Sequence, residues 1–321
     1  MAAQHHYVSK FHLREFCDPD SLTTPDPWVW LGLIQGGTVK RRSPKNVGTA
    51  RLMFDGPGGL ADRDSSIEIF LANEVEGPAA RAIKRMGNSP INELPPELMR
   101  YLSWAASRSR PIQLEFIDWG NRFNEILAVP VAESPPDWLQ KALSLDRPSR
   151  MVHLRTGECA TVSGEDAMKL FDDGWFPDPL EQANFLEIAH CQALYFQHRW
   201  FPRLNWFTLR PPASEFFIIG DRPVGWGVPN AINAPPSCLR DPDAFVIAPV
   251  TRSLALVGRN SSEPWSITPA QVNGLLALWS HEWIAGPTEE IVQIALKARI
   301  TWLASAGKNS NVSESNVKAD E

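Results

Sequence analysis

The stretch WVWLGLIQGGTVKR, residues 28–41, carries a complete β-hairpin signal and decides how the rest of the chain is interpreted. Residues 28–34 form an apolar run of strand length. Gly36 and Gly37 supply the backbone freedom that a tight hairpin turn requires, and residues 38–41 begin the return strand. The sequence therefore predicts an antiparallel hairpin in the N-terminal part of the protein.

The hydrophobic period changes to that of a helix after the hairpin. A first helix is predicted to begin near Ser65, because apolar residues then recur every four positions, at Ile67, Leu71, Val75, Ala79 and Ile83. Pro78 should kink or restart it. A second helix is predicted within LPPELMRYLSWAASRSRP, residues 94–111, where Pro96 suits the first turn and Pro111 limits the end.

Weaker signals fill the middle of the chain. Residues 112–127 and 179–200 are interpreted as helices, and residues 156–157 as the turn of a small hairpin. The Gly-rich segment 55–64 is expected to be a loop, and it lacks the Lys-Ser/Thr ending of a phosphate-binding P-loop.

Strand patterns return in the C-terminal part. Strands are predicted at 205–209 and 216–219 and as a β pair within 244–257. Thr268, Pro269 and Gln271 then form a capping box with proline at the first helical position, which predicts the start of a helix.

Together these patterns predict a single α+β domain over residues 1–306. It would contain an N-terminal β-hairpin, a helical middle, and a small C-terminal sheet with a closing helix. Residues 307–321 are polar and are expected to form a disordered tail. The 321-residue chain is 43% hydrophobic and 21% charged, which suits a globular protein that buries a core without disulfides.

Charge and cysteine content narrow the functional class. The formal net charge of -6 argues against a generally basic nucleic-acid binder, although a nucleic acid or nucleotide partner stays open. No apolar run approaches the roughly 18 residues that span a membrane. The four cysteines form no CxxC pair and no signal-peptide pattern is visible, so we expect a cytoplasmic protein with reduced thiols.

Six motifs of this chain occur in the order and at the spacing typical of one protein family. They are HYVSKFHLREF (6–16), PKNVG from Pro44, VEGPAARAI from Val75, RSRP (108–111), FIIGDRPV (217–224) and APVTRSLAL from Ala248. Together they resemble the domain-of-unknown-function family 4238, from His6 to about Gly286. Ser9 replaces the usual proline of the first motif, and either Arg108 or Arg110 can correspond to the family arginine. The resemblance implies no reaction and no cofactor.

His6 is the first candidate for chemistry. A metal site is not favoured, because His6 and His12 are six positions apart and helical ligand pairs lie three or four apart. His6 is then either a partly buried histidine bonded to the backbone, or a proton carrier for general acid–base catalysis.

Two carboxylates and two arginines complete the candidate site. Glu76 lies in an apolar helix, so it either pairs with Arg14 or Arg110 or acts as a base or metal ligand. Asp221 follows the apolar strand FFII, which is a common place for an active-site group, but it also fits a turn before Pro223. The arginines are either ion-pair partners or an anion clamp.

We therefore carry two functional hypotheses. In the first, the protein is a hydrolase acting on a phosphodiester or a nucleotide, with His6 as acid–base group, Glu76 and Asp221 as catalytic carboxylates, and Arg14 and Arg110 binding the anion. In this first hypothesis, whether the carboxylates also hold a divalent cation is left open. In the second, the same residues form a buried His/Arg/Glu/Asp network in a non-catalytic binding or protein-interaction module.

Overall fold

The predicted N-terminal hairpin is present in the computed structural model of the protein. β2 (Val29–Leu33) pairs antiparallel with β3 (Val39–Arg42). Gly36 and Gly37 between them have φ angles of +84° and +62°, which glycine adopts at no steric cost. The prediction of a Gly-Gly turn is therefore confirmed.

The structure describes a defined part of the chain. The described residues are 4–51, 69–87, 90–91, 93–109, 149–153, 158–162, 166, 175–177, 189, 192–194, 196–229, 236–261 and 265–317. Within them the fold is α+β, as expected from the sequence, and every strand pair is antiparallel.

The strands form small sheets. One has the order β10-β11-β12-β8, another β3-β2-β13-β9, a third β6-β5-β7, and β1 pairs with β4. The remaining strand bounds are β1 Gln4–His6, β4 Thr49–Arg51, β5 Ser149–His153, β6 Cys159–Val162, β7 Trp175–Pro177, β8 Asn205–Leu209, β9 Ile219–Gly220, β10 Gly225–Gly227, β11 Phe245–Thr251, β12 Leu254–Arg259 and β13 Trp283–Gly286.

The helices are of three kinds. The α-helices are α1 Lys10–Arg14, α3 Gly77–Met86, α4 Pro96–Ser107, α9 Pro269–Trp279 and α10 Glu289–Val317. The π-helical turns are η3 Leu71–Glu76 and η6 Phe196–Trp200. Short 3₁₀ turns are η1 Pro19–Ser21, η2 Pro44–Asn46, η7 Phe201–Arg203 and η8 Pro236–Arg240.

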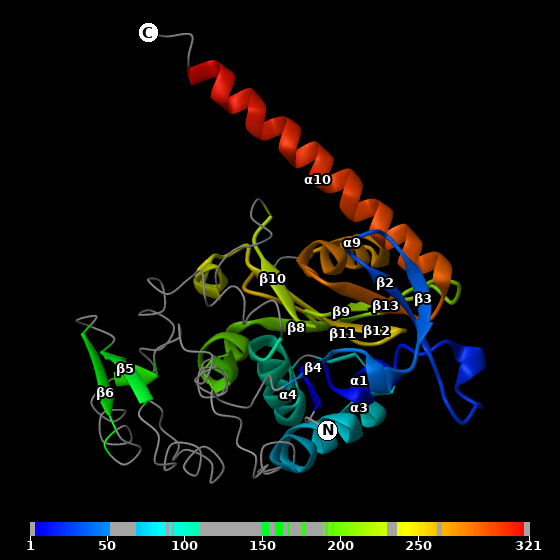
Figure 1. Ribbon diagram of the computed structural model, residues 1–321, viewed down its shortest axis with the longest axis horizontal. Coiled ribbons are helices and arrows are strands. Elements are labelled where there is room, and N and C mark those ends of the chain that lie inside the picture. Colours follow the sequence, from blue (N-terminus) through cyan, green and yellow to red (C-terminus); the bar gives the residue numbers. More distant parts are fainter. Residues whose placement is uncertain are drawn as a thin grey trace.

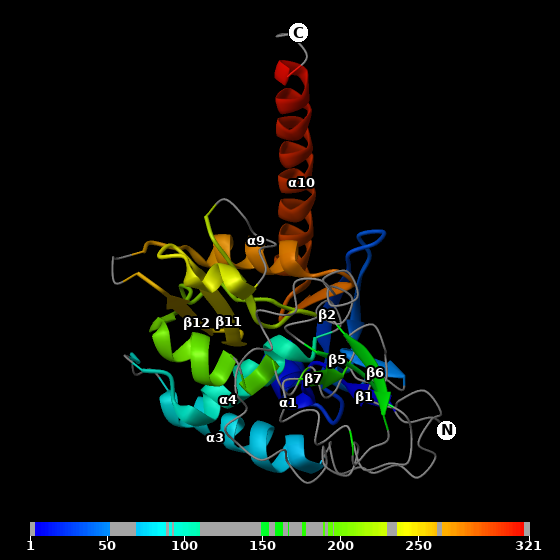
Figure 2. The same ribbon diagram turned by 90° about the vertical axis from the view of Figure 1, so that its left-hand side faces the viewer.

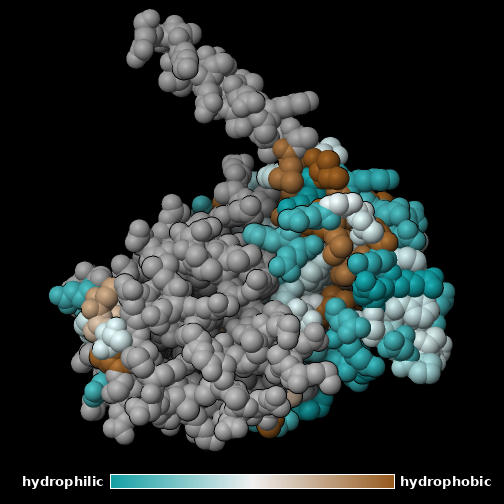
Figure 3. Space-filling model, in the orientation of Figure 1, coloured by the Kyte–Doolittle hydropathy of each residue, from teal (hydrophilic) through white to brown (hydrophobic). Residues whose placement is uncertain are grey.

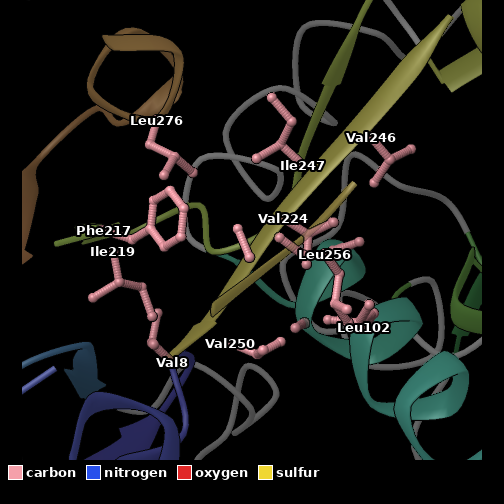
Figure 4. Close-up of a cluster of buried hydrophobic side chains, with 14 of the residues drawn as sticks. Val8, Leu102, Phe217, Ile219, Val224, Val246, Ile247, Val250, Leu256 and Leu276 are labelled. Carbon is pink, nitrogen blue, oxygen red and sulfur yellow. The ribbon is translucent and has the colours of Figure 1, made fainter. Parts of the chain in front are cut away.

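The elements stack in layers. Strands β8 to β13 lie in the middle, α9 and α10 cover one side, and α1, α3 and α4 lie on the other, as both views show (Figure 1, Figure 2). The side chains between the layers are apolar and buried: Leu276 of α9 points toward Phe217, and Val8 lies beside Ile219 (Figure 4). The core thus joins both ends of the chain.

The predicted helices of the middle segment are confirmed where the structure describes them. Pro78 restarts the first helix, because the π-helical turn η3 ends at Glu76 and α3 begins at Gly77. Pro96 opens α4 as expected. The expected loop 55–64, the helix 112–127 and most of the helix 179–200 lie outside the described residues.

The predicted C-terminal elements are also present, with altered bounds. β8, β11 and β12 match the expected strands, whereas the strand expected at 216–219 is only the two-residue β9. The Thr268–Gln271 capping box closes as predicted, with Thr268 Oγ1 accepting the Gln271 N–H at 3.2 Å. Helix α10 extends to Val317, into the segment expected to be a tail.

Helix α10 leaves the body of the protein as a long projection (Figure 1, Figure 2). Its first turns pack on α9, β2 and β13. Apolar surface gathers at the base of the projection (Figure 3), where Ile294, Ile300, Trp302 and Leu303 are exposed. Among the described residues, no helix is long and apolar enough to cross a membrane.

Candidate functional site

The first motif, HYVSKFHLREF, enters the fold as the end of β1 followed by α1. The backbone N–H groups of Tyr7 and Val8 both donate to the carbonyl oxygen of Gly48, at 2.9 and 3.3 Å. Leu13 and Phe16 are fully buried and fix the helix to the core. Because Gly48 belongs to the PKNVG motif, two of the motifs that carry the family resemblance hold each other in place.

An ion pair lies directly beneath this segment. Arg108, the C-terminal cap of α4, donates from Nη2 to Oε1 of Glu76 at 2.7 Å. Ser9 Oγ donates to the same carboxylate oxygen at 2.6 Å and accepts a hydrogen bond from Arg108. The Arg108 side chain is 2% exposed and that of Glu76 is 23% exposed. A guanidinium at this depth is stable only with such a partner.

His6 lies beside this pair and is half-buried. Its ring is hydrogen-bonded to the backbone of Lys45, while its Nε2 atom is buried and has no hydrogen-bond partner among the described residues. Burial lowers the pKa of His6, the Glu76 carboxylate opposes that shift, and Arg108 and Lys10 add to it. The Nε2 atom of this half-buried ring is therefore left unsatisfied by the described residues.

A second histidine of the motif is sealed in the core. His12 is fully buried, with Nε2 2.8 Å from the carbonyl oxygen of Pro249 and Nδ1 2.7 Å from the hydroxyl of Tyr101. A carbonyl only accepts, so Nε2 carries the proton and Tyr101 donates to Nδ1. Burial lowers the pKa of His12 to about 4 and raises the pKa of Tyr101. His12 is thus neutral in the folded protein at neutral pH.

These side chains form one group, which we name the N-terminal polar cluster. Its members are His6, Ser9, His12, Glu76, Tyr101 and Arg108. The charges of Glu76 and Arg108 act on both histidines and on Tyr101. Burial acts to raise the pKa of Glu76, but Arg108 and Ser9 outweigh it and hold that pKa below its usual range. Glu76 is therefore an ionised carboxylate at neutral pH.

Asp221 lies at the end of β9 and is fully buried. Its carboxylate accepts the backbone N–H of Glu282 at 2.6 Å and that of His281 at 3.1 Å. Burial raises the pKa of Asp221 to about 7, against the effect of these hydrogen bonds, and the Glu282 carboxylate adds to the rise. None of its described contacts involves His6, Glu76 or Arg108, so the structure does not bring this candidate into the cluster.

One contact connects the Asp221 turn with the first motif. Trp283 donates from Nε1 to the hydroxyl of Tyr7 at 2.9 Å, and that hydroxyl lies 3.5 Å from Oε2 of Glu282. Asp221 holds the backbone that presents both of these groups. The described hydrogen bonds of the Asp221 carboxylate thus come from residues 281 and 282 and not from the turn before Pro223. They link the end of β9 to the segment whose side chains contact Tyr7, next to His6.

The two arginines expected to bind an anion are not part of the described cluster. Arg14 is exposed in the last turn of α1, and none of the described contacts joins it to Glu76. Arg110 lies outside the described residues. Of the RSRP motif, Arg108 lies within the described residues and reaches Glu76.

A metal centre does not emerge from the described residues. They contain no group of three or more His, Cys, Asp or Glu side chains that could hold an ion. Glu76 accepts its described hydrogen bonds from Ser9 and Arg108.

Comparison with known proteins confirms the family resemblance over part of the chain. The family described as "Protein of unknown function (DUF4238)" matches residues 4–107. This range contains five of the six cluster residues and ends one position before Arg108; the stretches 217–224 and 248–256 lie outside it. No curated protein and no solved structure gives a significant match to the chain.

Sequence reasoning found His6 and Glu76 but missed the roles of four neighbours. In the sequence, Ser9 stands out only as a departure from the family motif, His12 only by its distance from His6, and Arg108 only as one of two arginines before Pro111. Tyr101 carries no such mark. Its signal is the burial of a hydroxyl within an apolar helix face, which requires a partner.

Proposed function

We propose that the N-terminal polar cluster transfers protons to and from a bound anionic substrate, and that the protein is a hydrolase acting on a phosphodiester or a nucleotide. The observation that carries this proposal is the Nε2 atom of His6, which is buried and has no described partner beside the Glu76–Arg108 ion pair. Buried polar atoms are normally satisfied, so an unsatisfied imidazole nitrogen suits a group that bonds to substrate.

The charges around His6 favour an anion. Glu76 and Arg108 neutralise each other, which leaves Lys10 as an additional positive charge that acts on the ring. A phosphodiester carries a single negative charge and would match that balance. This support is independent of the overall charge of -6, because the charges act locally.

The proposed reaction needs only His6 as the proton carrier. The neutral imidazole accepts a proton from a water molecule as the water oxygen bonds to phosphorus. The imidazolium then returns that proton to the leaving-group oxygen as the phosphorus–oxygen ester bond breaks. Glu76 favours the imidazolium, and Ser9 and Arg108 hold Glu76 in place.

A second candidate function is a non-catalytic binding or protein-interaction module. Its support is that Ser9, Glu76 and Arg108 hydrogen-bond to one another and that Arg108 is almost fully buried. A guanidinium in this position stabilises the fold and is poorly placed to clamp a substrate. Under either candidate function, we propose that the protein is cytoplasmic. The support is the absence of a CxxC pair in the sequence.

The test is hydrolysis of bis(p-nitrophenyl) phosphate and of a panel of nucleotides by the full chain. Each assay is run with EDTA and with Mg²⁺, Mn²⁺ or Zn²⁺, because a divalent cation remains part of the first proposal. His6→Ala should lower turnover by at least ~100-fold, the contribution typical of a general acid–base group. His198→Ala, which removes an exposed histidine in η6, is the matched control and should leave turnover unchanged.

Two results would count against the hydrolase. One is the absence of turnover under every condition with folded protein. The other is turnover that His6→Ala and His198→Ala affect equally. Either result favours the binding module, whose partner would then be sought by interaction methods.

A further inference from the structure

The helix that carries Glu76 is built in an unusual way. Residues Leu71–Glu76 form the π-helical turn η3, and the N–H of Gly77 bonds to the carbonyl oxygen of Ala72, five residues back. π-helical turns are rare, and they are found frequently at functional sites. Glu76 is the last residue of this turn, and its carboxylate meets Ser9 and Arg108.

Two consecutive residues explain why the turn is wide. Pro78 has no N–H, so it cannot make the ordinary α-helical hydrogen bond to the carbonyl of Glu74. Gly77 has no Cβ, and a Cβ there would lie 2.8 Å from the carbonyl oxygen of Ala72. Since real Cβ atoms do not approach a backbone oxygen that closely, the observed turn requires glycine at position 77.

The width of the turn decides where Glu76 points. One extra residue in a helical turn rotates the residues on its two sides by about 100° relative to each other. Val75 and Ala79 are buried on the two sides of Glu76, so the apolar face is continuous across the turn. If the turn tightened to an α-helix while this face stayed buried, the Glu76 side chain would leave its position against Ser9 and Arg108.

We propose that Gly77 is a positioning residue: together with Pro78 it sets the π-helical turn that aims Glu76 at the N-terminal polar cluster. The catalytic consequence of this assignment rests on the proposed function of His6. The positioning itself does not, because the Glu76 carboxylate acts on the His6 ring whether or not a reaction follows.

The imidazole of His6 is therefore the reporter. Glu76 raises the pKa of His6, whereas Arg108 and Lys10 lower it. Moving the carboxylate away removes the stabilising charge, so the imidazole pKa falls. A substitution that merely destabilises the fold at a distance leaves this value unchanged.

The experiment follows the histidine ring protons by NMR during a pH titration of the full chain. His6→Gln identifies the His6 resonance, and Glu76→Gln gives the direction and size of the carboxylate effect. Gly77→Ala should lower the imidazole pKa of His6 in the same direction as Glu76→Gln. Gly274→Ala is the control, because Gly274 lies within α9 and a Cβ there meets nothing within 4 Å.

A second variant covers the case in which Gly77→Ala does not fold. Pro78→Ala restores the N–H donor and allows an α-helical turn without placing an atom against Ala72. It should lower the His6 pKa as well. The assignment is overturned if the folded variants at 77 or 78 keep the wild-type His6 pKa while Glu76→Gln lowers it, and equally if Glu76→Gln itself has no effect.

The outcome is separable from that of the proposed function. If no substrate is turned over but Gly77→Ala lowers the His6 pKa, the hydrolase fails and the positioning assignment stands. If His6→Ala abolishes turnover but Gly77→Ala changes neither the His6 pKa nor the rate, the hydrolase stands and the positioning assignment fails.

Discussion

The hydroxyl of Tyr101 lies 2.7 Å from Nδ1 of His12, and the two residues are separated by 89 positions in the sequence. Tyr101 comes from α4 and His12 from α1, so this hydrogen bond joins the first motif to the helical layer. The other ring nitrogen reaches the carbonyl of Pro249 in β11. One buried imidazole thus connects three elements that are distant along the chain.

We expect Tyr101→Phe to destabilise the protein by about 1–3 kcal/mol. The variant keeps the ring and its packing but leaves Nδ1 of His12 buried without a donor, and that cost is typical of an unsatisfied buried group. Urea unfolding followed by tryptophan fluorescence measures the change. An unfolding free energy equal to that of the wild type would mean that a water molecule or a rearrangement replaces the hydroxyl.

The stability of the protein should depend on pH through His12. Its pKa is about 4 in the folded protein and near 6.5 when unfolded, so between these values only the unfolded chain gains the proton. The contribution of the neutral His12 ring to the free energy of unfolding is fully present above pH 6.5 and declines as the pH falls toward 4. Over this range the free energy of unfolding should fall by about 3 kcal/mol through His12 alone.

Asp221 should act in the opposite direction over nearly the same range. Its pKa is about 7 when folded and 3.8 in its ordinary state, so its contribution is fully present below pH 3.8 and is lost as the pH rises through 7. The two effects largely cancel in the wild type. We expect Asp221→Asn to make the unfolding free energy rise with pH between 4 and 6.5, and His12→Gln to make it fall. Matching slopes in both variants would contradict this assignment.

The buried ion pair should matter far more than an exposed one. Arg108→Met leaves the Glu76 carboxylate without its partner, and we expect a loss of about 3–5 kcal/mol in the free energy of unfolding. Arg85→Met is the control, because the Arg85–Glu97 pair has a similar distance, 2.9 Å against 2.7 Å, but its side chains are 63% and 37% exposed. That loss should stay below about 1 kcal/mol. Similar losses in the two variants would mean that the cluster is more hydrated than its burial indicates.

If the hydrolase proposal holds, its pH profile should report His6. As a general base His6 must be neutral, so kcat/KM should fall on the acidic side with a midpoint below 6.5, since burial lowers its pKa. Glu76→Gln should move that midpoint to still lower pH, because it removes the charge that favours the imidazolium. A midpoint above 6.5, or one that ignores Glu76→Gln, would assign the acidic limb to another group.

Local signals predicted the elements that are specified locally. The Gly36-Gly37 turn and the Thr268 capping box depend on a few adjacent residues, and both formed as expected. By contrast, β13 has the sequence WIAG and is buried along its whole length between β2 and β9. A short strand that is buried on both faces shows no alternation of polar and apolar residues, so its period carries no signal.

The candidate site was predictable only in part, for a similar reason. His6 could be singled out as a histidine of the first motif that can carry protons near neutral pH, and Glu76 as a carboxylate on the inner stretch of an amphipathic helix. The choice between Arg108 and Arg110 depends on how the end of α4 is oriented, which a four-residue motif does not specify. The partner of His12 is a backbone carbonyl 237 positions away. Every residue has a backbone carbonyl, so the sequence does not indicate which one His12 contacts.

The pairing of β2 with β13 has a consequence for the synthesis of the protein. β2 pairs with β3 locally, but Trp30 also lies opposite Gly286, so β2 gains this second neighbour only when most of the chain has left the ribosome. The hydrogen bonds of the first motif also form late, because Tyr7 accepts from Trp283 and His12 bonds to the carbonyl of Pro249. The contacts that tie residues 4–107 to β11 and β13 can therefore form only late in synthesis. Pairing over such a sequence separation slows folding, because the loop must close before the contacts form.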